Sequence, residues 1–134
     1  MMIKGLAHVC FIVADLDRAL AFYGGTLGFK TAFEFRRDNG VRYGVYLKAG
    51  ARAFIELFQG EVPARTAKQS FQHICLEVDD VARTVAYLRA HSIEVTDPKL
   101  GLDQSWQAWL SDPDGNRIEL HGYTPQSWQT PHLG

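Results

Sequence analysis

The hydrophobic positions of the first half of the chain follow two different periods. Runs with a period of two are typical of half-buried strands, whereas apolar residues recurring every three or four positions are typical of an amphipathic helix. Strands are predicted on this basis at residues 5–13, 30–37, 42–49 and 53–58, and a helix is predicted over 16–28. The order is therefore one strand, one helix and three further strands.

The second half shows the same order of periods. Strands are predicted at residues 71–78, 93–97, 105–112 and 116–123, with a helix over 81–92. Each half is thus a βαβββ arrangement, and the chain as a whole is predicted to have an α+β fold.

The two halves also have similar amino-acid sequences. "AHVCFIVADLDRA" at 7–19 aligns with "QHICLEVDDVART" at 72–84 at an offset of 65, and "YLKAGARAFIEL" at 46–57 aligns with "WLSDPDGNRIEL" at 109–120 at an offset of 63. Two blocks at nearly equal offsets indicate a duplicated module of about 65 residues.

We therefore expect a single domain over 1–134 that is built from two modules. Module 1 is predicted to span 3–60 and module 2 to span 70–123. The polar segment 61–69 is the expected linker, and residues 124–134 form a tail without usable periodicity.

Polar residues mark the expected helix starts and one tight turn. Asp15 precedes the first helix, and either Asp79 or Asp80 precedes the second, where a side-chain oxygen can accept hydrogen bonds from the first backbone N–H groups. "DPDG" at 112–115 predicts a turn between the last two strands, because Pro favours a bend and Gly tolerates positive φ.

Composition and charge disfavour some classes of binding partner. The formal net charge is -1 and 46% of residues are hydrophobic, which disfavours nucleic acid or an anionic membrane as partner. No apolar run approaches the roughly 20 residues that a bilayer span requires. The two cysteines, Cys10 and Cys75, occupy equivalent positions of the repeat, and we interpret them as reduced thiols of a cytoplasmic protein.

Two histidines and two glutamates share one side of the predicted sheets. Alternate residues of a strand face opposite sides, so His8, Glu56, His73 and Glu119 all fall on the helix-free faces. A single histidine or glutamate in a strand is usually structural or solvated. The repeated combination, with carboxylates between large apolar neighbours, instead predicts a metal site, because a buried carboxylate is costly unless it is paired or metal-bound.

The segments "GLAHVCFIVADLDRALAFYGGTLGF", "FIEL", "FQHICLEVDD" and "DPDGNRIEL" resemble the vicinal oxygen chelate superfamily, which contains glyoxalase I, bleomycin-resistance proteins and extradiol dioxygenases. The resemblance covers residues 3–123. It implies that the two βαβββ modules form a curled mixed-sheet cup around a divalent metal ion. The implied metal ligands are His8, Glu56, His73 and Glu119.

The complete set of four ligands resembles that of glyoxalase I-like lyases. The resemblance implies a divalent-metal-dependent lyase or isomerase that acts on a small vicinal-oxygen substrate, with Ni, Co, Zn, Mn or Fe as the ion. The hypothesis is proton transfer next to a carbonyl through a metal-bound enediolate, in which Glu56 or Glu119 acts as general base and then as general acid.

Two other functions remain open. One is an Fe(II) or Mn(II) dioxygenase that uses only His8, His73 and Glu119, and the other is a small-molecule binding or resistance protein without catalysis. Ile12 and Gly60 occupy the positions at which bacterial glyoxalase I has an arginine and an asparagine that contact glutathione. This difference argues against lactoylglutathione as the product.

Strand parity also predicts residues that contact the substrate in the cup. These substrate-binding candidates are Phe54, Phe58, Gln107, Trp109 and His121. Similar single-domain proteins often dimerise so that modules of two chains complete each cup, and the resemblance therefore implies a homodimer. The sequence leaves open whether the two ligand pairs combine within one chain or between two.

Overall fold

The computed structural model describes residues 2–134 and divides the chain into two compact units. Unit 1 is Met1–Ala64 and unit 2 is Arg65–Gly134. Each unit has its own four-stranded sheet. Among residues 2–134, no helix combines the length and the apolar character needed to cross a bilayer.

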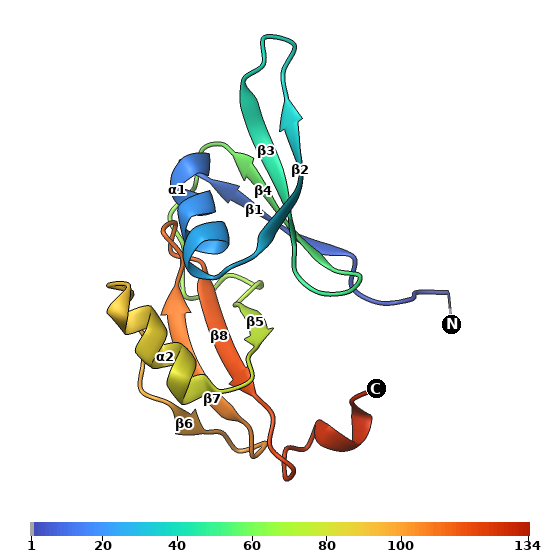
Figure 1. The fold of residues 1–134 in the computed structure, drawn as a ribbon, viewed down its shortest axis with the longest axis vertical. Helices are drawn as coiled ribbons and strands as arrows, with labels where there is room; N and C mark the ends of the chain where they lie inside the picture. The colour runs from blue at the N-terminus through green and yellow to red at the C-terminus, as the bar shows by residue number, and fades with distance from the viewer. Residues whose placement is uncertain (1) are drawn as a thin grey trace. The chain divides into compact units, whose positions relative to one another are not determined.

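Unit 1 is a four-stranded mixed sheet with a short helical segment on one face (Figure 1). The strand order is β1-β4-β3-β2, with β1 parallel to β4 and the other neighbours antiparallel. The elements are β1 (His8–Val13), α1 (Leu16–Leu20), the π-helix η1 (Ala21–Thr26), β2 (Lys30–Arg36), β3 (Arg42–Lys48) and β4 (Phe54–Gln59).

Unit 2 repeats this topology with the order β5-β8-β7-β6 and a parallel β5–β8 pair. Its elements are β5 (Ile74–Glu77), α2 (Val81–Ala90), β6 (Lys99–Leu100), β7 (Trp106–Ser111), β8 (Arg117–Gly122) and the 3₁₀-helix η2 (Thr130–His132). The predicted α+β class with two βαβββ arrangements is confirmed, and both sheets are mixed and open.

Each helix buries one face of its sheet and leaves the other face for different side chains. In unit 2, Leu88 of α2 packs on the face that carries Ile118 and Leu120 of β8, all at most 2% exposed. Burying one such side chain contributes about 1.5–3 kcal/mol. Glu119, between Ile118 and Leu120 in the chain, must therefore point to the opposite, helix-free face.

The first helix differs from the prediction over 16–28. The regular α-helix ends at Leu20, and residues 21–26 form a wider turn in which the Leu27 N–H donates to the Phe22 carbonyl at 2.9 Å, five residues back. Gly24 and Gly25 lie within this turn and have low helix propensity, which makes a departure from α geometry inexpensive.

The strand predicted over 93–97 is wrong. The edge strand of unit 2 is only Lys99–Leu100, beyond Pro98, which cannot donate a ladder hydrogen bond. Thr96 instead holds the chain to β7 through two bonds to Trp109. Its N–H donates to the Trp109 carbonyl at 2.9 Å, and its hydroxyl accepts from the Trp109 N–H at 2.8 Å.

The predicted caps and turn are confirmed. The Asp15 carboxylate accepts from the Arg18 N–H at 3.0 Å, and the Asp80 carboxylate accepts from the Arg83 N–H at 2.9 Å. Of the two aspartates left open, Asp80 is thus the cap. The turn at 112–115 has Gly115 at φ +83.

Candidate metal site

A carboxylate and an imidazole meet on the helix-free face of unit 2. Glu119 lies on β8 directly opposite Cys75 of β5, and His73 precedes β5 by one residue. The His73 Nε2 atom is 3.2 Å from Glu119 Oε2. Two ligands of one divalent ion lie about 3.0–3.4 Å apart when each bond is near 2.1 Å. The pair therefore fits a shared metal ion.

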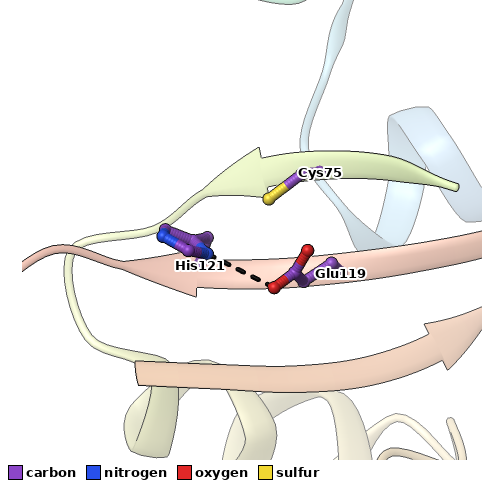
Figure 2. Close-up of side chains that lie close together, drawn as sticks. All are labelled: Cys75, Glu119 and His121. Atoms are coloured by element: carbon purple, nitrogen blue, oxygen red, sulfur yellow. Dashed lines mark hydrogen bonds and ion pairs between the residues drawn. The ribbon is translucent and has the colours of Figure 1, made fainter. Parts of the chain in front are cut away.

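The other oxygen of Glu119 faces a second histidine. His121 is two residues further along β8 and points to the same face, where its Nδ1 lies 3.3 Å from Glu119 Oε1 (Figure 2). Cys75 completes a cluster with these two residues, because one ligand atom from each of the three lies within 4.8 Å of the others. Glu119 is thus held between two imidazoles beside a thiol.

Asp103 stands behind His121. Its Oδ2 is 3.7 Å from His121 Nε2, and the same carboxylate accepts from Gln129 Nε2 at 2.6 Å and from the Ser105 N–H at 3.1 Å. The Gln129 hydrogen bond is the main reason that the pKa of Asp103 is lowered from its ordinary value. The C-terminal tail therefore fixes a carboxylate beside the candidate site.

Trp109 braces His73 from the neighbouring strand. It lies opposite Glu119 on β7, and its ring meets the His73 ring edge-on at 4.7 Å between centroids. The Arg117 guanidinium lies over the same indole, 4.6 Å from its centroid. Gln107, two residues earlier on β7, lies opposite His121. The two β7 candidates thus lie opposite Glu119 and His121 in the sheet, and their contact with a substrate stays a prediction.

Unit 1 places a tyrosine between its predicted ligands. The Tyr46 hydroxyl is 3.4 Å from His8 Nδ1. A hydrogen bond to Glu56 is the largest cause of the raised pKa of Tyr46. Sequence reasoning missed Tyr46, although its place opposite Glu56 on β3 and its alignment with Trp109 were available signals.

Both thiols hold their protons strongly. Burial of the sulfur, a hydrogen bond to Glu56 and the charge of that carboxylate raise the pKa of Cys10 to about 11. Burial of the sulfur and the charge of Glu119 raise the pKa of Cys75 to about 12. Both residues are free cysteines that remain accessible to solvent. Because both pKa values lie far above 7, each cysteine is a protonated thiol at neutral pH.

The two phenylalanine candidates of unit 1 belong to an aromatic cluster. The Phe58 ring covers Gly44, where an added Cβ would come within 2.4 Å of it, and it lies 5.3 Å from the Phe35 ring. Phe54 lies 5.6 Å from the Tyr46 ring. Packing accounts for these positions, and substrate contact by Phe54 and Phe58 stays a prediction.

A comparison with protein families identifies the family of the chain. Residues 5–120 match the family model described as "Glyoxalase/Bleomycin resistance protein/Dioxygenase superfamily".

Individual proteins and solved structures are also similar to this chain. A lactoylglutathione lyase of Salmonella typhimurium is 31% identical, covering 86% of this chain and 90% of the relative. A metallothiol transferase, FosB, of Staphylococcus epidermidis is 26% identical, covering 90% and 83%. Among solved structures, a glyoxalase family protein from Enterococcus faecalis has a TM-score of 0.78 at 25% identity and covers 90% of this chain and 99% of its own.

Proposed function

The chain belongs to the glyoxalase/bleomycin resistance protein/dioxygenase superfamily, and we propose that it is a divalent-metal-dependent lyase or isomerase. Its substrate would be a small molecule with adjacent oxygens, and its reaction a proton transfer next to a carbonyl. The relatives named as lactoylglutathione lyase and metallothiol transferase support metal-dependent chemistry in proteins of this kind.

The observation that carries the proposal is the His73–Glu119 pair at 3.2 Å. Its spacing suits two ligands of one ion, and the duplication supplies a second histidine and glutamate, His8 and Glu56, on the equivalent face of unit 1. We therefore assign these four residues as ligands of one Ni, Co, Zn, Mn or Fe ion. Imidazole and carboxylate ligands suit this group of metals.

The bound ion would act as a Lewis acid that polarises a substrate carbonyl and makes the adjacent C–H more acidic. Glu119 and Glu56 are the residues proposed to accept and return the proton. The contact of His121 with one oxygen of Glu119 orients that carboxylate. Substrate contacts are assigned to the flanking candidates Phe54, Phe58, Gln107, Trp109 and His121.

The test combines metal loading with proton exchange. Protein stripped with a chelator is refilled with each ion and incubated in deuterium oxide with 2-hydroxy ketones and with hemithioacetals of methylglyoxal and small thiols. We expect deuterium at the carbon next to the carbonyl, lowered at least about 100-fold in Glu119→Gln and Glu56→Gln. Glu94→Gln, an exposed residue of unit 2, is the matched control. Full exchange in both site variants would refute the proposal.

A complementation experiment tests how the ligand set is completed. We propose a homodimer in which His8 and Glu56 of one chain join His73 and Glu119 of the other. Mixed dimers of His8→Ala and His73→Ala chains would then contain one intact set and recover metal binding and exchange. No recovery after unfolding and refolding the mixture would place the set within one chain.

A dioxygenase is the second candidate, and one observation favours it. Glu56 already has hydrogen-bond partners in Tyr46 and Cys10, so it is engaged without a metal. Three ligands, His8, His73 and Glu119, would then hold Fe(II) or Mn(II). Oxygen uptake that survives Glu56→Gln would support this candidate, whereas ligand binding that survives metal removal would support a pure binding protein.

A further inference from the structure

We propose that Cys75, Glu119 and His121 form a thiolate-containing site in unit 2 for a thiophilic divalent cation such as Zn²⁺ or Cd²⁺. This site does not depend on the proposed function, because all three ligands lie on β5 and β8 of one unit and neither His8 nor Glu56 takes part. Glu119 is the only residue that it shares with the four-ligand set.

Strand register brings the three donors together. Cys75 and Glu119 are direct partners in the parallel β5–β8 pair, and His121 follows Glu119 on the same face. Sulfur, carboxylate oxygen and imidazole nitrogen lie within 4.8 Å of one another (Figure 2). Tetrahedral zinc ligands lie about 3.3–3.8 Å apart, given bonds near 2.0–2.3 Å. Small side-chain rotations therefore close the site.

Asp103 supplies the support that a histidine ligand needs. Metal-bound histidines usually donate their other ring N–H to a carboxylate, which fixes the tautomer and the ring orientation. His121 Nε2 is buried without a hydrogen-bond partner and lies 3.7 Å from Asp103 Oδ2. Gln129 and the Ser105 N–H hold that carboxylate in place. The Nδ1 atom of His121, which faces Glu119, is then the metal-binding nitrogen.

The sulfur determines which ions the site prefers. A thiolate favours soft or borderline ions such as zinc, whereas the His73–Glu119 pair offers only nitrogen and oxygen. Because the thiolate is the form that binds a metal ion, binding forms a metal–sulfur bond and releases the thiol proton to solvent, with no change of oxidation state.

Unit 1 provides a natural control for this site. Its Cys10 and Glu56 are paired on β1 and β4 just as Cys75 and Glu119 are paired in unit 2. The position that aligns with His121 is Phe58, which has no donor atom. A thiol beside a glutamate is thus common to both units, whereas the third ligand is specific to unit 2.

The experiment titrates the reduced, chelator-stripped full chain with Cd²⁺ alone and follows the thiolate-to-cadmium charge-transfer absorption in the ultraviolet. We expect saturation at one ion per chain in wild type and in Cys10→Ser. The band should vanish in Cys75→Ser. His121→Gln and Asp103→Asn should each weaken binding at least about 10-fold, with far-ultraviolet circular dichroism confirming that both variants fold.

Two outcomes would overturn the site. Equal losses of absorption in Cys10→Ser and Cys75→Ser would show adventitious binding to exposed thiols. Loss of the band in Glu56→Gln would show that cadmium–thiolate binding needs a residue of unit 1, which the proposed site excludes. Failure here is distinct from failure of the proposed function, because proton exchange by the reloaded protein is measured separately and needs neither Cys75 nor cadmium.

Discussion

On the helix-free face of each unit, residues paired on adjacent strands form rows across the sheet. One row has the same kinds of residue in both units, whereas the row next to it differs. The shared row is a cysteine, a glutamate and an aromatic residue, which are Cys10, Glu56 and Tyr46 in unit 1 and Cys75, Glu119 and Trp109 in unit 2. The neighbouring row is Ile12, Phe58 and Gly44 in unit 1, and Glu77, His121 and Gln107 in unit 2.

This difference separates the two glutamates chemically. In unit 1 the neighbouring row is apolar, and Phe58 lies across Gly44 as part of an aromatic cluster. In unit 2 the same place holds His121, which fixes one oxygen of Glu119. A duplicated scaffold has thus kept one row of chemical groups, while the adjacent row serves packing in one copy and a polar network in the other.

The largest expected effect comes from giving unit 1 the ligand that it lacks. Phe58→His places an imidazole beside Cys10 and Glu56, so a second cadmium–thiolate band should appear. The affinity of unit 1 for cadmium should be at least about 100-fold higher in this variant than in wild type. This factor is the upper end of what an outer-shell partner of a metal ligand contributes. The affinity should stay below that of unit 2, where Asp103 supports His121.

Phe58→Leu is the matched control, because it removes the same ring without adding a donor. A new band in both variants would show that loosening the aromatic cluster, rather than the imidazole, exposes Cys10. No new band in Phe58→His, with the fold intact, would show that the row difference does not explain the preference for unit 2.

Local patterns predicted much of this comparison from the sequence. The cap at Asp15 and the turn at 112–115 depend on a few adjacent residues, and strand parity correctly assigned Glu119 to the face away from Leu120. The resemblance to the superfamily is confirmed by the match over residues 5–120. The joint role of the four ligands stays a prediction.

Features that depend on distant residues were missed. Asp103 lies 3.7 Å from His121 Nε2 and is hydrogen-bonded to Gln129 and Ser105, and no period in the sequence indicates such a link. The strand prediction over 93–97 is wrong because the Thr96 hydroxyl, instead of a backbone carbonyl, accepts the hydrogen bond from the Trp109 N–H of β7. The alternation of apolar and polar residues in a strand predicts the face on which a side chain lies, but it does not predict which distant residue the side chain contacts.

The thiols offer a second, smaller contrast. In metal-free protein burial is the main cause that raises the pKa of Cys10 to about 11 and the pKa of Cys75 to about 12, so Cys10 is the more ionised thiol at pH 9. Since the thiolate is the nucleophile, iodoacetamide should modify Cys10 faster than Cys75. Both rates should rise about tenfold per pH unit between pH 8 and pH 10, because both groups remain mostly protonated there.

Peptide mass spectrometry after timed quenching measures both rates in one sample. Glu56→Gln is an internal check. Burial is the largest cause of the raised pKa of Cys10, but the hydrogen bond to Glu56 and the charge of Glu56 add to it, so removing that charge should accelerate the modification of Cys10 alone. Faster modification of Cys75 than of Cys10 would contradict the assigned order.

The smallest expected effect concerns the two helix caps. Asp80 is the side-chain acceptor at the start of α2, so Asp80→Ala should lower the free energy of unfolding by about 1 kcal/mol. Asp15→Ala should cost only about 0.5 kcal/mol, the lower end of the range for such caps. The reason is that Gln59 Oε1 already accepts from the Leu16 N–H at 3.0 Å, so α1 keeps one acceptor at its first turn.

Urea unfolding followed by circular dichroism measures both losses, and Asp79→Ala is the control because Asp79 is exposed and adjacent to the Asp80 cap. Replacing Gln59 as well tests the explanation directly. In a Gln59→Ala background, Asp15→Ala should cost about 1 kcal/mol, as Asp80→Ala does in unit 2. An unchanged cost would mean that Gln59 does not substitute for the cap, and that the two helix starts differ because α1 gives way to the π-turn after only five residues.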